Sequence, residues 1–384
     1  MALTTRSQRE KDLNPGRDPW SPWLHIDVML VLSTLALAAF GAAMVYSATR
    51  GTDPTAYDTT FLERQLMFIM IGGALMAATA MIPYERLQAW APVVYVGGVL
   101  GLVGVLAFGV TRNGATSWFE VGGFQLQPSE FLKVGFIVVL ASFVSRQDGE
   151  LNAAQLAVAL MISAVPLALI MQQPDVGTAL VYVAITMGIL LIGGAKFRHI
   201  SALTVIGIGL AVAVWNSGVL ASYQRDRLTS FLDPASSQAE AAFQQTQAQI
   251  AIGSGGVRGT GFGQGIQTRG EFVPEQHTDF IFTVVGEEFG FMGSALVLGL
   301  FGVLVWRTWR TAKKAADLFG ALLCVGVMTM VVFQMFQSVG MTLGIMPITG
   351  IPVPFLSYGG SSALTSFVAV GLVLNVHMRR HVVR

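Results

Sequence analysis

The sequence is short of both charge and cysteine. Only 12% of its 384 residues are charged, which is about half the fraction found in soluble domains. The formal net charge of +1 excludes the strong basic field of a nucleic-acid-binding protein. Cys324 is the single cysteine, so an internal disulfide and a cysteine-based metal site are both excluded.

A nucleotide-binding motif is also missing. No lysine lies between Lys196 and Lys313, and residues 253–265 (GSGGVRGTGFGQG), here named the glycine segment, contain no G-x-G-x-x-G register. Two interpretations of the glycine segment stay open. It forms a tight loop that needs positive φ angles, or its backbone closely approaches a ligand such as a diphosphate, with Arg258 and Arg269 nearby.

Long apolar runs are what the chain has in abundance. Hydrophobic residues make up 53% of the sequence, and several runs exceed about 18 residues, the length of a transmembrane helix. The runs are continuous rather than alternating, which excludes a β-barrel. We therefore expect an all-α polytopic membrane protein with ten spans, at about residues 27–47, 66–82, 91–109, 129–146, 154–171, 175–194, 200–216, 280–305, 320–338 and 361–378.

The expected organisation is a cytoplasmic tail (1–26) followed by one transmembrane domain (27–384). Placing both termini in the cytoplasm puts 15 of the 23 lysines and arginines on the inner side, including the short basic connections WRTWRTAKK and AKFRH. The largest outer loop is then 217–279, where SSQAEAAFQQTQAQIAIG predicts a helix capped by Gly253. The inner loops are short and basic, so we expect the chemistry on the outer face.

Polar residues at the outer ends of several spans are candidates for that chemistry. Pro128 suits a helix start, and Glu130 and Lys133 share one helix face, as either a structural ion pair or part of a cavity lining. Asp175 suits the N-cap of the sixth span. The loop 347–362 predicts a re-entrant or cavity-lining segment with polar contacts from Ser357, Tyr358, Ser361 and Ser362.

The stretch PEQHTDFIF places Asp279 where the eighth span begins. Its residue type favours a helix cap, yet a carboxylate at an apolar mouth with cations nearby can also be tuned as a general base. We expect His277 to be a hydrogen-bonding neighbour, because no second His or Cys accompanies it as a metal ligand. Mg²⁺ or Mn²⁺ needs only one or two carboxylates plus a substrate phosphate, so Asp279 is the candidate metal ligand.

Two further acids, Glu287 and Glu288, follow in the same span. At 1.5 Å per residue they lie about 12–14 Å further in than Asp279. We expect them to give structural support, with Lys133 as a possible partner.

Five blocks in order resemble the SEDS family (shape, elongation, division and sporulation). They are NGATSWFEVGGFQLQPSEFLK, QPDVGTAL, QAQIAIGSGGVRGTGFGQG, FVPEQHTDFIFTVVGEEFGFMGS and GIMPITGIPVPFLSYGGSS. The resemblance implies a ten-span enzyme with both termini cytoplasmic, a peptidoglycan glycosyltransferase that polymerises lipid II on the outer face of the bacterial inner membrane. EFVPEQHTDFIF, FLDP and the short C-terminal tail resemble the elongation branch, which serves cell elongation and rod shape.

The resemblance also implies site residues and partners. The essential aspartate of the family falls on Asp279, and its other polar positions fall on Glu130, Lys133 and Asp175. Family activity implies a divalent cation and a class B penicillin-binding protein as the transpeptidase partner, within an elongation complex. The chain departs from many relatives at Ser338, where they have Asn.

The expected mechanism follows from this set. Asp279 is the candidate base, and a divalent ion with Arg225, Arg227, Arg258 and Arg269 is expected to stabilise a departing diphosphate. The other candidate substrate-binding residues are Glu130, Lys133, Asp175, His277 and Ser357. Three alternatives remain: a lipid II flippase, the division branch of the family with the same chemistry, and a scaffold for the penicillin-binding partner.

Overall fold

The computed structural model describes residues 25–51, 57–112, 115–147, 149–217, 231, 240–270 and 272–380. The predicted N-terminal tail, except for residues 25 and 26, lies outside this part of the chain. Arg225 and Arg227 also lie outside it.

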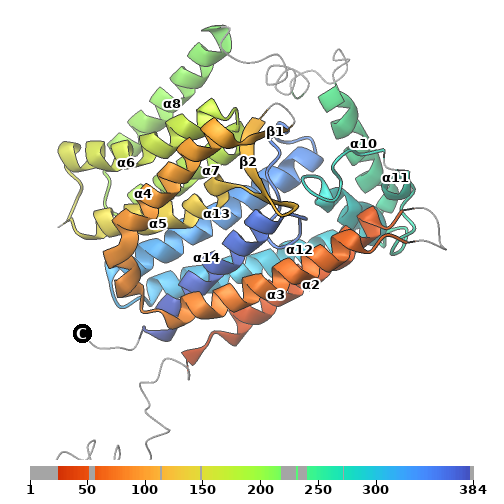
Figure 1. Cartoon of the computed structure of the whole chain (residues 1–384), viewed down its shortest axis with the longest axis horizontal. Coiled ribbons are helices and arrows are strands. Elements are labelled where there is room, and N and C mark those ends of the chain that lie inside the picture. The colour runs from red at the N-terminus through yellow and green to blue at the C-terminus, as the bar shows by residue number, and fades with distance from the viewer. Residues whose placement is uncertain are drawn as a thin grey trace, which may run out of the picture.

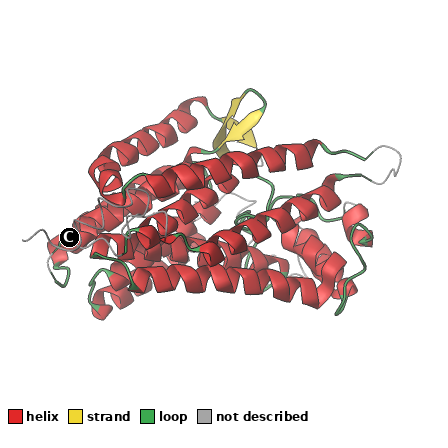
Figure 2. Ribbon diagram, turned by 90° about the horizontal axis from the view of Figure 1, so that it is seen from below, coloured by secondary structure: helices red, strands yellow, loops and turns green. Residues whose placement is uncertain are grey.

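Ten helices of the described chain correspond to the ten predicted spans (Figures 1 and 2). They form one bundle, except that α8 contacts mainly α7 and projects away from the others. Eight are long and apolar enough to cross a membrane, while α7 and the first part of α8 are shorter apolar helices. The ten are α2 (Val28–Thr49), α3 (Thr60–Met81), α4 (Tyr84–Phe108), α5 (Pro128–Ser145), α6 (Ala153–Gln172), α7 (Val176–Ile192), α8 (Phe197–Ser217), α12 (Ile281–Lys313), α13 (Leu318–Thr342) and α14 (Gly360–Met378).

Smaller elements fill two of the connections. Between α4 and α5 lies an antiparallel sheet of β1 (Val110–Arg112), β2 (Ala115–Val121) and β3 (Phe124–Leu126), which the sequence did not lead us to predict. Before α12 lie α10 (Glu240–Gly255) and α11 (Ile266–Arg269). The predicted cap at Gly253 was wrong, because α10 runs on to Gly255. The residue after its end, Gly256, takes the left-handed conformation (φ 53°) typical of a helix C-terminus.

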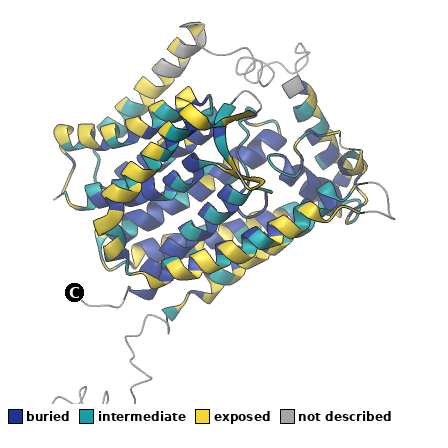
Figure 3. Cartoon of the chain, viewed as in Figure 1, coloured by how far each residue is buried: buried dark blue, intermediate teal, exposed yellow. Residues whose placement is uncertain are grey.

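The spans α5, α13 and α14 form the buried centre of the bundle, whereas α3 and α4 expose much of their surface (Figure 3). Close packing of α3 on α14 depends on small residues, as in other membrane bundles. A Cβ on Gly371 would meet the Met76 backbone at 2.7 Å. At the end of α3, Arg379 donates hydrogen bonds to the carbonyls of Ala80 (2.9 Å) and Met81 (2.7 Å). Asn375 donates to those of Thr79 and Ile82.

Helices α2 and α12 are fastened to each other at both ends. At one end Asp27 caps α2 and accepts a hydrogen bond from Nε of Arg307 (2.8 Å), and the ion pair between the two side chains brings Nη2 of Arg307 within 2.7 Å of the same carboxylate oxygen. At the other end Ser47 donates a 2.5 Å hydrogen bond to Glu288. About 20 residues separate Asp27 from Ser47, or about 30 Å of helix, which equals the thickness of a hydrocarbon core. The two contacts therefore lie near the two surfaces of the membrane.

Candidate active site

Asp279 lies in the turn that leads into α12, and it is partly exposed. The N-cap position of α12 is occupied by Phe280, so the predicted capping role of Asp279 was wrong. The preceding turn explains the difference, because the Phe280 amide donates back to the Glu275 carbonyl and the helix begins one residue later than a cap at Asp279 requires. This position leaves the carboxylate at the mouth of the span, beyond the Ser47–Glu288 contact and at the opposite end from Asp27 and Arg307.

The loop between α13 and α14, residues 347–359, covers one side of Asp279. A Cβ on Gly350 would lie 3.2 Å from Oδ2 of Asp279, so the carboxylate faces this loop. The Tyr358 amide donates to the His277 carbonyl (2.9 Å), which holds the loop against the turn before α12. Ser338 donates to the Asp279 carbonyl at 3.3 Å. The residue that departs from the family pattern thus contacts the backbone of the candidate base.

Three half-buried rings form a cluster beside this turn. The ring centroids of Phe61 and His277 lie 5.1 Å apart, those of Phe61 and Tyr358 5.1 Å, and those of His277 and Tyr358 5.8 Å. Phe68 and Phe124 continue the cluster toward β3. Ring faces are electronegative and attract C–H groups, so such a cluster can contact the apolar face of a sugar.

A second group of polar residues gathers where α5 and α7 begin. Lys133 and Glu130 form the predicted ion pair at 2.7 Å, and both side chains are buried. Asp175 caps α7 as predicted, accepting from the Thr178 amide at 2.9 Å. The side-chain amide of Gln127 donates a hydrogen bond to Asp175 (3.1 Å), and the backbone amide of Gln127 donates one to the Ser361 hydroxyl (2.9 Å). The starts of α5, α7 and α14 are thereby linked.

The loop 347–359 also joins this group to Asp279. A Cβ on Gly177 would lie 2.6 Å from the Thr349 carbonyl, so the first turn of α7 packs directly under the loop. The next residue, Gly350, faces Asp279. Ser357 is buried, and its hydroxyl accepts a 2.8 Å hydrogen bond from the Val353 amide. Its contribution in this structure is to shape the loop, and its substrate contact stays a prediction.

Glu287 and Glu288 do give structural support, but Lys133 is not their partner. Glu287 accepts hydrogen bonds from the Gln267 amide (2.8 Å), the Thr268 amide (2.9 Å) and the Thr268 hydroxyl (2.6 Å). These amides open the short helix α11. Lys133 is paired with Glu130 within its own helix, which explains why the expected longer-range pairing was wrong. Glu288 accepts a hydrogen bond from Ser47, near the end of α2 opposite to Asp27.

Three described arginines lie on or next to α2 and the segment before α12. Arg258, in the glycine segment, and Arg269, the last residue of α11, are both exposed. The sequence argument overlooked Arg50, whose guanidinium donates to the Gly263 carbonyl and lies 5.0 Å from the Tyr57 ring centroid. It was assigned to the outer side by charge counting, but nothing in its neighbourhood indicated contact with the glycine segment.

Other residues of the site were overlooked because their roles depend on distant segments. Gln127 precedes a helix start and gives no local sign that it joins Asp175 to Ser361. Phe61 looks like any apolar residue at the start of a span. Gly350 is one of many glycines, and only its proximity to Asp279 distinguishes it.

No group of three or more His, Cys, Asp or Glu side chains that could hold a metal occurs among the described residues. A divalent ion would therefore fit as one shared by the Asp279 carboxylate and a substrate phosphate, which is the usual arrangement for Mg²⁺. Asp279 is the residue that would hold it.

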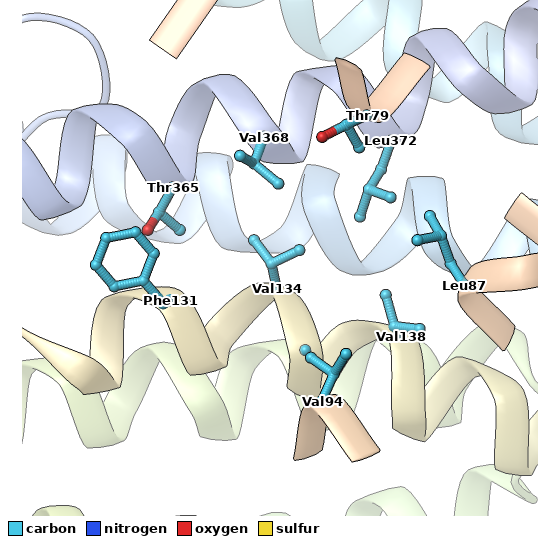
Figure 4. A pocket seen from close by; sticks show the side chains of 10 residues that line it. Thr79, Leu87, Val94, Phe131, Val134, Val138, Thr365, Val368 and Leu372 are labelled. Carbon is cyan, nitrogen blue, oxygen red and sulfur yellow. The ribbon is translucent and has the colours of Figure 1, made fainter. Parts of the chain in front are cut away.

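An apolar cavity of about 230 Å³ lies between α3, α4, α5 and α14 (Figure 4). Its lining has no titratable group and can accept an apolar chain but not a charged one. It is lined by Thr79, Leu87, Val94, Phe131, Val134, Gly135, Val138, Thr365, Val368 and Leu372.

Comparison with known proteins identifies related sequences along nearly the whole chain. Residues 27–382 match the family of FtsW, RodA and SpoVE, described as "Cell cycle protein". The peptidoglycan glycosyltransferase MrdB of Escherichia coli K12 is 33% identical over 96% of this chain and 97% of its own length. Stage V sporulation protein E of Bacillus subtilis is 39% identical over 91% of this chain and 96% of its own.

Solved structures show the same fold. A chain from a peptidoglycan synthase complex, described by its structural coordination of polymerization and crosslinking, superposes with a TM-score of 0.80. It is 31% identical over 94% of this chain and 100% of that one. The rod shape determining protein RodA of Thermus thermophilus gives a TM-score of 0.70 at 30% identity, over 94% of this chain and 99% of its own. On sequence and fold together, the chain belongs to the FtsW, RodA and SpoVE family of membrane proteins.

Proposed function

We propose that this protein is a peptidoglycan glycosyltransferase that polymerises lipid II into glycan strands on the outer face of the bacterial inner membrane. The observation that carries the proposal is the position of Asp279. Its partly exposed carboxylate lies at the outer mouth of α12, beside the loop 347–359 and a cluster of half-buried rings. The activity by which MrdB is named supports the same chemistry.

Chain growth forms one bond and breaks another. The 4-hydroxyl oxygen of one sugar forms a bond to the anomeric carbon of the other, and the bond from that carbon to the polyprenyl diphosphate breaks. The hydroxyl proton passes to the Asp279 carboxylate, which acts as general base, and the diphosphate leaves with the bonding electron pair. Since the donor already carries an activated leaving group, the reaction needs no ATP.

The departing diphosphate requires positive charge near its oxygens. Arg258 and Arg269 are exposed on the segment that precedes α12, and Arg50 reaches the same segment from α2. Arg225 and Arg227 stay candidates outside the described residues. A divalent cation bound when substrate is present would add charge at the phosphates, with Asp279 as its protein ligand.

Sugar binding is assigned to the aromatic cluster. Phe61, His277 and Tyr358 come from three separate segments, and their rings contact one another. His277 is two residues before Asp279 in sequence. Contact of a pyranose C–H face with these rings would hold its hydroxyl near the base.

The buried group at the starts of α5 and α7 positions the loop that faces Asp279. Glu130, Lys133 and Asp175 lie beneath it, and Gln127 links Asp175 to Ser361 at the start of α14. We assign these residues to support of the site, with any direct contact to substrate secondary.

The proposal includes a class B penicillin-binding protein as partner and a role in the elongation complex. The solved peptidoglycan synthase complex, whose polymerization and crosslinking are coordinated, supports a partner of this kind. We also propose that both termini face the cytoplasm. In support, His377 near the end of α14 lies 3.8 Å from Asp27 at the start of α2.

Glycan polymerisation from purified lipid II tests the function directly. The protein is reconstituted with its penicillin-binding partner, and transpeptidation is blocked with a β-lactam so that only glycosyl transfer builds polymer. Long glycan strands on a gel are expected. Movement of labelled lipid II between vesicle leaflets without polymer would instead identify a flippase.

A further inference from the structure

Helix α12 is interrupted at Gly290, which has φ 61° and ψ −154°. In a continuous helix the amides of residues 291 and 292 would donate to the carbonyls of residues 287 and 288. The break separates these pairs and leaves two donors and two acceptors near the outer membrane surface. Such groups are costly in an apolar medium unless they find other partners.

The glycine segment supplies all four partners. The amides of Thr260 and Gly261 donate to the carbonyls of Glu287 and Glu288, each at 3.0 Å. In the opposite direction, the Phe291 amide donates to Gly256 (2.9 Å) and the Met292 amide to Val257 (3.1 Å). Each of these four main-chain groups is therefore paired, and every partner lies in the glycine segment.

The depth of this junction follows from the two contacts between α2 and α12. Ser47 and Glu288 mark the outer surface of the hydrocarbon core, about 30 Å from Asp27 and Arg307. Met292 is four residues further along α12, past the break, and so lies on the Arg307 side of Glu288. The Val257 carbonyl bonded to it must lie at the same level, which is inside the outer leaflet.

Four of the side chains around the junction are both apolar and exposed. Val257 is 65% exposed, Phe291 70% and Met292 61%. Phe262 is 44% exposed, and its ring packs on Phe289 with centroids 6.3 Å apart. Exposed apolar side chains at this depth, on a loop that hydrogen-bonds to the main chain of α12, fit acyl chains and not water.

We propose that the glycine segment is embedded in the outer leaflet, with Val257 and Phe262 contacting lipid acyl chains. It is thus a membrane-facing wall of the protein and not part of an aqueous loop. Arg258, exposed and next to Val257, lies close enough to the surface for its long side chain to reach the lipid phosphates. The proposal depends on the geometry of α12 and is independent of the glycosyltransferase activity.

Site-specific fluorescence tests the proposal. Cys324 is buried and the chain has no other cysteine, so Cys324→Ala gives a background for single labels. Val257→Cys is labelled with a polarity-sensitive dye in detergent and reconstituted into phosphatidylethanolamine–phosphatidylglycerol vesicles. Met70→Cys, an exposed mid-span site of α3, is the bilayer reference, and Asp58→Cys, in the outer connection before α3, is the aqueous reference.

The expected result is a blue-shifted emission at position 257, as at position 70. Lipids with a nitroxide at acyl carbon 5 should quench it several-fold more than those with one at carbon 14, and aqueous iodide should quench it less than at position 58. Iodide quenching equal to that at position 58 would overturn the proposal, because the segment would then lie in water. Protection from both quenchers would overturn it too, since a second copy or another protein would cover the segment.

Discussion

Ser47 and Glu288 are 241 residues apart in sequence and joined by a 2.5 Å hydrogen bond between α2 and α12. Asp27 and Arg307 join the same two helices at the opposite end of α2. The two contacts fix the register of α2 against α12. The buried carboxylate of Glu288 is thereby part of the packing between the two helices.

Asp279→Asn is expected to abolish glycan polymerisation while lipid II binding is retained. The amide keeps the size of the side chain but cannot accept the hydroxyl proton. Polymer synthesis with the partner protein and binding of labelled lipid II are measured on the same preparation. Full polymerase activity in this variant would contradict the base assignment.

Lys133→Met is expected to lower the yield of folded protein and its unfolding midpoint in detergent. Removing one member of a buried ion pair typically costs about 3–5 kcal/mol, because the other charge is left unpaired. The double variant Glu130→Gln with Lys133→Met should recover much of the loss. Normal yield and midpoint with lost activity would instead show that Lys133 acts on substrate.

Ser47→Ala is expected to destabilise the protein by about 1–3 kcal/mol, since the buried Glu288 carboxylate loses its side-chain donor. Ser33→Ala is the control. Ser33 lies on the same helix, and its exposed fraction is 4%, as for Ser47. Its hydroxyl donates to the Leu30 carbonyl of its own helix. Unfolding midpoints in detergent compare the two variants, and equal values would contradict the role of the contact.

Gly290→Ala is expected to lower stability sharply. Its positive φ disfavours any side chain, and an added Cβ would lie 2.8 Å from the Gly256 carbonyl oxygen and from the Val257 carbonyl carbon. Gly302→Ala, on the same helix with open space around its Cβ position, should be neutral or stabilising by about 0.5–1 kcal/mol. Comparable thermal stability of the two variants would argue against the break in α12.

Tyr358→Leu is expected to weaken lipid II binding by about tenfold, whereas Tyr358→Phe should bind nearly as wild type. Only the ring face is needed for contact with a sugar. The apparent KM and the unfolding midpoint are measured together. A lower midpoint with unchanged KM would show that the ring only packs against Phe61 and His277.

The bundle could be predicted from the sequence because each span is a continuous apolar run whose length matches the membrane. The ion pair of Glu130 with Lys133 and the cap at Asp175 were equally predictable, since both are contacts within one or two helical turns. The N-cap of α12 is Phe280 and not Asp279, one residue later than the residue type suggested, because the turn at Glu275 decides where α12 begins.

Hydrogen bonds between residues far apart in the chain could not be predicted from the sequence. The sequence around Glu287 gives no sign that its carboxylate accepts hydrogen bonds from the amides of Gln267 and Thr268. Lys133 was therefore an equally reasonable partner on sequence alone. The glycine segment was similarly open to two interpretations. Its role in completing α12 depends on backbone hydrogen bonds, and those leave little trace in residue type.

The fastening of α3 by Asn375 and Arg379 has a consequence for biosynthesis. The second span leaves the ribosome almost 300 residues before the side chains that cap its last carbonyls. Until α14 is inserted, the end of α3 has its terminal carbonyls without these partners. Closure of the bundle must therefore wait until α14 has been translated, so loss of that helix would leave α3 unfinished as well.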